Sequence, residues 1–556
     1  MNKLDFIVMG VFALLILSIG MAFTHMGSKN GNSYFEAGGE TPWWINGLSL
    51  FISYFSAGTF VVWGSIAYKY GLVANGIQLT MVIGGLLVAI FVAAKWKKTG
   101  ALTAAEYIGQ RFNNKTQQFY TILIMLYSLL STAAVLYPVG KMVNVATGLN
   151  VNTCILIIGG IIILYTAAGG LWAVLVTDVV QFVILTAAVF IVIPLAFREV
   201  GGIHNFTGKA PADFFKFFNS EYSFEFFLAF LAYQTIYIGG NWAYVQRYTS
   251  VSNVRNSRRV AYLFAGLYLI SPFIWMLPPM IYRVLNPGLT GLQPEGAYMM
   301  ICSRVLPAGL IGLVLSGMIS ATASKANTTI NLVAVVFAND VFKKLIRPAA
   351  TEQNVINSAR IFTVFFGILT IGIAMMVPLV GGIVEVVLST ASIAGGSLFA
   401  PILWSLYSKK QNATSVIAAS VSSLVVSLFF KTIAPRLLHI SLNRVEETAL
   451  GVGLPVLVLL AAEFMLPVIA DISLPDRRLV AVGTKEDERH RNSAISQNVF
   501  GIKVIAISVG IVGIGVLVLG TLAKNGGIAM IVGAATAGVF FPVWRSARRL
   551  QKQITA

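Results

Sequence analysis

The sequence predicts an all-α polytopic membrane protein with about 13–15 transmembrane helices. Of its 556 residues, 57% are hydrophobic and only 11% are charged, whereas a soluble domain has roughly 25% charged residues. About fifteen apolar stretches are long enough, or nearly long enough, to cross a bilayer, which takes roughly 20 residues in a helix. Because these stretches are long and continuous rather than short and alternating, they favour helices over a β-barrel.

The apolar stretches follow one another along most of the chain. The first contains LDFIVMGVFALLILSIGMAF. We interpret it as a membrane helix rather than a signal peptide, because it is too long and lacks a small-residue cleavage site. The fifteen stretches lie near residues 4–25, 43–66, 72–95, 120–146, 152–168, 171–196, 226–246, 259–284, 307–337, 359–379, 382–406, 414–430, 449–470, 503–522 and 527–545.

The net charge of +18 is distributed unequally between the two sides of the membrane. With fifteen crossings, about 26 lysines and arginines fall on one side and about 12 on the other. The side rich in lysine and arginine is expected to be cytoplasmic, which places the N-terminus outside and the C-terminus in the cytoplasm. The basic charge then orients the protein, and we expect no nucleic-acid partner. Because we see no targeting segment, we expect a bacterial inner (plasma) membrane.

Several classes of function are disfavoured by what the sequence lacks. It has no Walker-type phosphate loop and no metal-spaced cluster of His and Cys, and its four histidines are scattered, which disfavours an enzyme or an ATP-driven pump. Cys154 and Cys302 both fall near the outer face, where a disulfide is conceivable, but buried free thiols are favoured. The polar segments 197–224 and 471–502 are expected to be solvated linkers. No organic cofactor and no obligate protein partner are evident.

Polar groups inside the membrane are costly unless they face protein or a water-filled path. The stretch SLFISYFSAGTFVVWGSIAY carries Gly58 and Gly64 among several hydroxyls. It predicts a helix that unwinds at mid-membrane and so exposes backbone carbonyls to a binding cavity. A glycine-packed helix contact is the alternative interpretation. Charged or amide groups also stand in apolar surroundings at Asp178, Asn241, Lys325 and Glu463.

Six stretches of the chain together resemble the sodium/solute symporter family, which includes sodium/glucose and sodium/proline transporters. They occur in the order and spacing of that family, up to about residue 410. The stretches are Ser33 to Phe60, Leu102 to Lys115, Tyr165 to Gln181, Asn241 to Val251, Ile319 to Phe342, and Leu403 to Lys410.

The resemblance implies a LeuT-like core of two inverted five-helix repeats that works by alternating access. The core would span 43–410, with its repeats at 43–196 and 226–406. Residues 1–42 would form an extra N-terminal helix and a cytoplasmic linker. Residues 411–556 would form C-terminal flanking helices that include the cytoplasmic loop 471–502.

One sodium site is implied between two of the predicted helices. By resemblance, the backbone carbonyls of Ile52, Phe55 and Gly317 would line it, and hydroxyls of the helix that carries Lys325 would complete it. Hard oxygen ligands suit a small hard cation. The family commonly has two adjacent serines at this place, whereas here Ser320 is followed by alanine. This sodium site has therefore lost a ligand.

A second ion position, described in some members of the family, would use Asp178 with Ser320 and Ser324. The two serines are four residues apart and so lie on one helix face. Capping or pairing near the cytoplasmic end of its helix is the alternative role for Asp178.

Lys325 stands four residues after Ala321, where the missing hydroxyl would have been. Helical side chains lean toward the N-terminus, so its ammonium group would lie near the incomplete sodium site. We hypothesise that Lys325 is a tethered cation that partly replaces this ion. Two alternatives remain: the side chain extends into a water-filled cytoplasmic vestibule, or it pairs with a carboxylate such as Asp178 or Glu463.

The positions that match the family's solute pocket carry neutral hydrogen-bonding or aromatic groups. Because a buried carboxylate substrate would need a cationic partner, these groups favour a neutral sugar or polyol. Gln78 replaces the acidic residue of galactose carriers, so galactose itself cannot be assumed. The matching positions are Tyr54, Thr59, Gln78, Ser131, Asn241 and Tyr268.

The prediction is therefore a secondary active transporter, not an enzyme, whose partners are a small solute, sodium and membrane lipid. Sodium-coupled symport is favoured. The alternative is a proton-coupled or uncoupled uniporter of the same fold in which Lys325 replaces one sodium. A channel would not accumulate solute, and a sensor would need a signalling module.

Overall fold

The computed structural model describes residues 1–27, 41–101, 103–165, 171–338, 351–469, 485–523 and 526–555, together with Phe342, Ile346 and Arg347. All regular secondary structure in these residues is helical. Most of the predicted linker before residue 43, and the first part of the predicted loop 471–502, lie outside the described residues.

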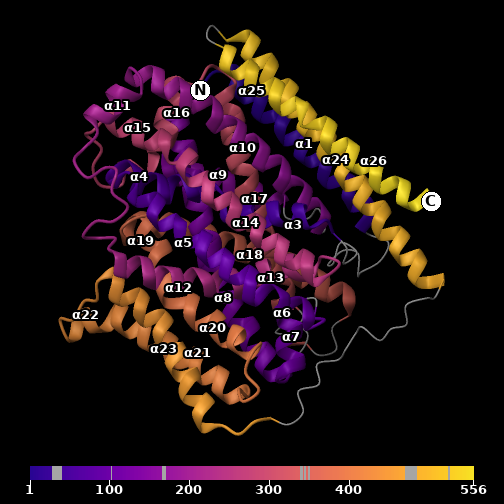
Figure 1. Ribbon diagram of the computed structural model, residues 1–556. Helices are drawn as coiled ribbons and strands as arrows, with labels where there is room; N and C mark the ends of the chain where they lie inside the picture. Colours follow the sequence, from indigo (N-terminus) through magenta and orange to yellow (C-terminus); the bar gives the residue numbers. More distant parts are fainter. Residues whose placement is uncertain are drawn as a thin grey trace.

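Every one of the fifteen predicted stretches overlaps a helix (Figure 1). Among the described residues, ten helices are long and apolar enough to cross a membrane, or eleven if one bent pair counts as a span. Two shorter apolar helices add to these, Val151–Ile163 and Leu310–Ala326. The structure therefore confirms an all-α membrane protein.

The part of the chain predicted to be the first repeat contains five long helical segments. They are α3 (Trp43–Tyr54) with η2 (Thr59–Trp63) and α4 (Gly64–Tyr70); α5 (Val73–Leu87) with η3 (Val88–Val92) and α6 (Ala93–Lys98); α8 (Asn114–Thr147), preceded by α7 (Ala104–Arg111); α9 (Val151–Tyr165); and α10 (Leu171–Val200).

The predicted second repeat follows after the short helix α11 (Ile203–Lys209). It contains α12 (Phe224–Gly240) with α13 (Trp242–Thr249); α14 (Val254–Trp275) with α15 (Leu277–Leu285); η4 (Gln293–Gly296) with α16 (Ala297–Val305); α17 (Leu310–Val336); α18 (Glu352–Met376) with η6 (Val377–Val380); and α19 (Ile383–Thr390) with η7 (Ala391–Gly395) and α20 (Gly396–Ser405).

The first long helix of each predicted repeat is interrupted. Helix α3 and the segment that starts at Thr59 meet at an angle of 53°. Helices α12 and α13 are separated by Asn241, whose φ of −63° and ψ of 127° are those of extended backbone. Each break leaves backbone groups without intrahelical partners, which makes both breaks candidates for ligand contacts.

The flanking helices lie at two edges of the core (Figure 1). Helix α1 (Lys3–Gly27) lies along one edge with α24 (Lys485–Leu522), α25 (Gly527–Gly538) and α26 (Phe540–Thr555). The other edge holds α21 (Ala413–Leu428), η8 (Phe429–Ile433), α22 (Ala434–Leu437) and α23 (Arg444–Met465).

One predicted boundary is wrong. Helix α24 begins at Lys485, so the second part of the predicted linker 471–502 is helical rather than irregular. Its first turns read KEDERHRN, in which acidic and basic residues recur at helical spacing. These turns contain no apolar residue, so a search for apolar stretches does not detect them.

Candidate functional site

The break between α3 and η2 is held open by the side chain of Thr59. Its Oγ1 donates a hydrogen bond to the carbonyl oxygen of Tyr54 at 3.1 Å and accepts one from the amide of Ser56 at 3.3 Å. Phe55 is extended, with φ −96° and ψ 113°. The predicted interruption of this helix is therefore present, and Thr59 pairs the carbonyl of Tyr54 and the amide of Ser56 within it.

The carbonyls expected to bind sodium belong to the end of α3 and to α17, two helices that have α10 as a common neighbour. Helix α10 packs against both α3 and α17. The carbonyl oxygen of Ile52 accepts a hydrogen bond from Phe55 N at 2.9 Å, which leaves it one lone pair for a further partner. Gly317 is buried on α17, and a Cβ there would lie 3.1 Å from Ile184 and Leu185 of α10.

Asp178 is joined to a buried arginine through a serine. The hydroxyl of Ser49 donates to Asp178 Oδ2 at 2.6 Å, and Arg247 Nε donates to Ser49 Oγ at 3.3 Å. All three residues are buried: Ser49 is 0% exposed, Asp178 5% and Arg247 6%. A buried carboxylate is tolerated when a cation and hydrogen bonds compensate it, so this geometry matches the pairing role considered for Asp178.

Ser320 has a different partner from the one the sequence suggested. Its hydroxyl accepts a hydrogen bond at 2.9 Å from Nε2 of Gln181, which stands nearly one turn after Asp178 on α10. Ser324 lies one turn further along α17 and also has a polar or electrostatic partner. The structure thus brings α10 and α17 together at this point, with Gln181 rather than Asp178 bonded to Ser320.

Aromatic rings connect the two helix breaks. The ring of Tyr54, at the end of α3, stacks on Tyr244 of α13 with centroids 4.8 Å apart. It also meets Tyr237 of α12 at 5.7 Å and Tyr268 of α14 at 6.1 Å. The Tyr54 hydroxyl is buried and has no hydrogen-bond partner among the residues that the structure describes, although such a group usually has one. A polar ligand between the breaks would satisfy it.

The other solute candidates are distributed around this aromatic cluster. Asn241 caps α13 by accepting a hydrogen bond from Ala243 N at 3.0 Å. Gln78 is 1% exposed on α5, and its Oε1 has no partner among the described residues. Ser131 is partly buried on α8. No hydrogen bond or ring contact within the described part of the chain joins Gln78 or Ser131 to Tyr54, Thr59 or Tyr268.

The residues that sequence reasoning missed here are Ser49, Gln181, Tyr237, Tyr244 and Arg247. Arg247 carried a usable signal, because an arginine beside an apolar stretch is costly unless it is paired or functional. The two tyrosines flank the break in YIGGNWAY. Ser49 and Gln181 had no distinguishing signal, since only their tertiary partners identify them.

Lys325 is partly buried on α17. No carboxylate in the described ranges lies within 4.0 Å of its ammonium group. Pairing with Glu463 is not formed, because that carboxylate accepts hydrogen bonds from Trp404, Ser408 and Gln411 instead. Pairing with Asp178 is not formed either, which leaves the vestibule and the tethered cation as interpretations of Lys325.

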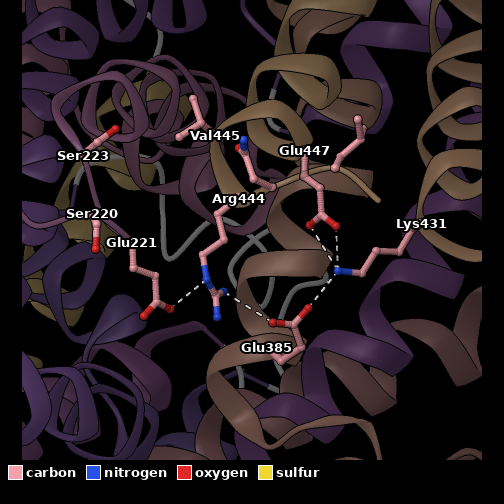
Figure 2. Close-up of a pocket in the computed structure, with 10 residues that line it drawn as sticks. Ser220, Glu221, Ser223, Glu385, Lys431, Arg444, Val445 and Glu447 are labelled. Carbon is pink, nitrogen blue, oxygen red and sulfur yellow. Dashed lines mark hydrogen bonds and ion pairs between the residues drawn. The ribbon is translucent and has the colours of Figure 1, made fainter. Parts of the chain in front are cut away.

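A second polar cluster lies away from the helix breaks, around a hollow of about 590 Å³ (Figure 2). Arg444 contacts Glu221 at 3.0 Å and Glu385 at 3.4 Å. Lys431 contacts Glu385 at 2.7 Å and Glu447 at 2.9 Å. These five alternating charges, which we call the charge network, join α19, η8 and α23 to the loop before α12.

The charge network also reaches the interrupted helix. The hydroxyl of Tyr70, at the end of α4, donates to Glu221 Oε2 at 2.7 Å. The guanidinium of Arg444 lies 5.6 Å from the centre of the Tyr222 ring. The predicted orientation would place the charge network at the outer surface.

Comparisons with known proteins agree with this architecture. The family model described as the sodium:solute symporter family matches residues 34–422. The chain is 28% identical over 471 residues to sodium/glucose cotransporter 1 of Mus musculus, covering 74% of this chain and 69% of the relative. It is 24% identical over 468 residues to the sodium/glucose cotransporter of Vibrio parahaemolyticus, covering 78% and 86%.

A solved structure shares the fold. The substrate-bound, outward-open structure of a Na⁺-coupled sialic acid symporter superposes with a TM-score of 0.70 and 22% identity, covering 84% of this chain and 99% of that one. This likeness confirms the LeuT-like fold that the resemblance implied. Because the family model covers more than half of the chain, this integral membrane protein belongs to the sodium:solute symporter family.

Proposed function

We propose that this protein is a secondary active transporter that couples sodium entry to the symport of a small neutral solute, a sugar or polyol being favoured. The observation that carries the proposal is the pairing of two interrupted helices whose breaks meet at the Tyr54–Tyr244 stack. In transporters, interrupted helices near mid-membrane provide backbone groups for ions and solutes. The sodium/glucose cotransporters among its relatives support the choice of a sugar.

The proposed sodium site fits the chemistry of the residues present. Its donors are oxygens only, namely the carbonyls of Ile52, Phe55 and Gly317 and the hydroxyl of Ser320, and hard oxygen ligands suit sodium. The site joins α3 to α17, so that a bound sodium ion would hold the interrupted helix against α17. Asp178, Ser320 and Ser324 would form the second ion position.

The proposed solute site is neutral. Tyr54, Thr59 and Tyr268 surround the first break, and Asn241 forms the second. Gln78 and Ser131 would complete the lining from neighbouring helices. Aromatic faces with a few hydroxyl and amide groups suit a polyhydroxylated solute, whereas a carboxylate would be left without a cation.

Uptake into proteoliposomes tests the proposal. Labelled sugars, polyols and amino acids would be offered with an imposed sodium gradient, a proton gradient or none. We expect accumulation of a neutral solute only with inward sodium. Equilibration without accumulation would contradict coupling, and accumulation of amino acids alone would contradict the proposed solute class.

A second candidate is proton-coupled or uncoupled transport in which Lys325 replaces one sodium. It is favoured by Ala321 in place of the second serine and by the lack of a carboxylate within 4.0 Å of Lys325 in the described residues. Lys325→Ser distinguishes the candidates. Uptake that gains a sodium requirement in the variant supports replacement, whereas unchanged sodium dependence supports a lysine that faces water.

We also propose that the N-terminus lies outside and the C-terminus lies in the cytoplasm, in a bacterial inner membrane. The unequal distribution of lysine and arginine supports this orientation. The proposed units remain the core 43–410, the extra helix before it and the flanking helices 411–556.

A further inference from the structure

The carboxylate of Asp5, on α1, caps the first turn of α17. Asp5 is 0% exposed, and its Oδ1 accepts hydrogen bonds from the amides of Gly309 at 2.7 Å and Gly312 at 3.1 Å. Its Oδ2 accepts one from the amide of Asn2 at 2.7 Å. The first amides of a helix have no partner within that helix. At the start of α17, the partner is the carboxylate of Asp5, which lies 304 residues before Gly309 in the chain.

Glycine at two positions permits this close approach. A Cβ at Gly312 would lie 2.2 Å from the backbone oxygen of Asp5, so any larger residue would separate the two helices. Gly309 has φ +88°, and a Cβ there would lie 2.7 Å from Leu519 of α24 and 3.2 Å from Leu4. The start of α17 is thus enclosed by α1 and α24.

The charge of Asp5 is balanced by α17 itself. Within the described ranges, no lysine or arginine lies within 4.0 Å of this carboxylate. The N-terminal end of a helix carries a partial positive charge that favours an anion. Because a buried charge without such partners is costly, the contact holds α1 and α17 in one relative position.

Helix α17 carries the proposed ion ligands directly after this cap. Gly317 follows Gly312 by five residues, and Ser320 follows by eight, a rise of about 12 Å along the helix. A helix transmits a displacement of its first turn along its axis, because its hydrogen bonds fix the rise of each residue. A shift of the Asp5 contact would therefore be passed along α17 to Gly317 and Ser320, where α17 packs against α10.

We propose that Asp5, on a helix outside both predicted repeats, is a positioning residue for sodium coupling. The inference rests on the proposed function, since it concerns the sodium ligands on α17. Asp5 does not touch sodium. It acts by keeping the Gly317 carbonyl and the Ser320 hydroxyl at the distance from Ile52 that the ion requires.

The test compares Asp5→Ala and Asp5→Asn with the wild type, and Asp213→Asn is the matched control. Asp213 is a carboxylate whose side chain is 69% exposed and which pairs only with Lys216 among the described residues. Uptake would be measured against sodium concentration at saturating solute, and against solute concentration at saturating sodium. A second readout, independent of transport, is the rise in melting temperature of purified protein on adding sodium.

We expect Asp5→Ala to raise the sodium concentration for half-maximal uptake about fivefold, which corresponds to the loss of one helix cap. The half-saturating solute concentration at saturating sodium should not change. Asp5→Asn should show a smaller shift, because its amide oxygen still accepts both bonds. The sodium-induced rise in melting temperature should need a correspondingly higher sodium concentration.

Sodium curves of both Asp5 variants that superimpose on the wild type and on Asp213→Asn would overturn the inference. The inference would also be overturned if both Asp5 variants lost maximal uptake rate to the same extent while the sodium concentration for half-maximal uptake stayed that of the wild type. Such a result would indicate that the cap has a purely structural role. If the Asp5→Ala protein does not fold in sufficient amount to be assayed, the sodium curve of Asp5→Asn decides between these outcomes. A wild type that shows no sodium-driven uptake refutes the proposed function instead.

Discussion

Thr59 supplies, through its side chain, hydrogen bonds to backbone groups at the first break that regular helical hydrogen bonds do not supply there. Its hydroxyl joins the carbonyl of Tyr54 to the amide of Ser56 across the interruption. Thr59→Val preserves the shape of the side chain but removes both bonds. If the distorted break costs the bound solute the equivalent of one hydrogen bond, about 1 kcal/mol, the half-saturating solute concentration rises about fivefold, and we expect a rise of this size.

Thr59→Ser is the control for this prediction, because it restores the hydroxyl without the methyl group. Its uptake should approach that of the wild type. A serine variant as impaired as the valine variant would assign the effect to packing of the methyl group. Unchanged uptake in Thr59→Val would remove Thr59 from the solute site.

Asp178 and Arg247 form a buried pair through Ser49, and each charge depends on the other. Asp178→Asn leaves the guanidinium buried without its counter-charge, which costs about 3–5 kcal/mol in comparable sites. We expect a marked fall in melting temperature and in folded protein for Asp178→Asn and for Arg247→Gln. The double variant should recover most of this loss, because both charges are then absent.

The double variant also separates the two roles considered for Asp178. Asp178 could bind sodium in addition to pairing with Arg247. In that case the melting temperature of the double variant will return toward that of the wild type, but its uptake will still need a higher sodium concentration than that of the wild type. Recovery of both properties would assign Asp178 to the ion pair alone. Sodium titrations of uptake, normalised to folded protein, give this comparison.

The charge network joins elements whose residues are far apart in the sequence. Lys431 lies between Glu385 of α19 and Glu447 of α23, with 26%, 35% and 20% of their side chains exposed. Lys431→Gln would leave the two carboxylates facing each other. Because such partly exposed contacts are screened by water and salt, we expect a loss of about 1 kcal/mol in unfolding free energy.

The loss of unfolding free energy in Lys431→Gln should become smaller as the salt concentration rises. Melting temperatures of this variant and the wild type at low and at high salt measure the change. Lys216→Gln is the matched control, because its ion pair with Asp213 is largely exposed and should contribute little. Equal effects of the two substitutions would mean that the charge network does not hold α19 to α23.

The orientation of the whole molecule can be tested with single cysteines. Cys154 and Cys302 are both buried free thiols, so they should not react with a membrane-impermeant maleimide in intact cells. We expect Lys216→Cys, in the loop before α12, to be labelled from outside. Arg549→Cys, on the exposed side of α26, should be labelled only after the membrane is opened. The reverse pattern would contradict the proposed orientation.

Much of the fold could be predicted from the chain alone. Each apolar stretch corresponds to a helix, because the cost of burying unpaired backbone groups in lipid makes long apolar segments helical wherever they fall. The interruption near Thr59 was also predicted, from glycines and hydroxyls within one apolar segment. The helical start of α24 was not predicted, because its first turns carry no apolar signal.

The candidate site was less accessible to sequence reasoning. Tyr54 and Tyr268 were expected near the solute, and the structure brings their rings together. Asp178 was expected beside Ser320, but its hydrogen bond goes to Ser49 and that of Ser320 comes from Gln181. Helical spacing shows which residues share a face, but it does not show which face of another helix they meet.

The sequence by itself determined the membrane class, the helical segments, the break at Thr59 and the family resemblance, because these depend on local hydropathy and on short motifs. Tertiary structure alone decided the partners of the buried charges. Arg247 compensates Asp178, Arg444 and Lys431 alternate with three glutamates, and Asp5 caps α17. Each set combines residues of different helices or loops, which only the packing of helices brings together. Ser49 bridges Asp178 and Arg247, whereas the other groups are in direct contact.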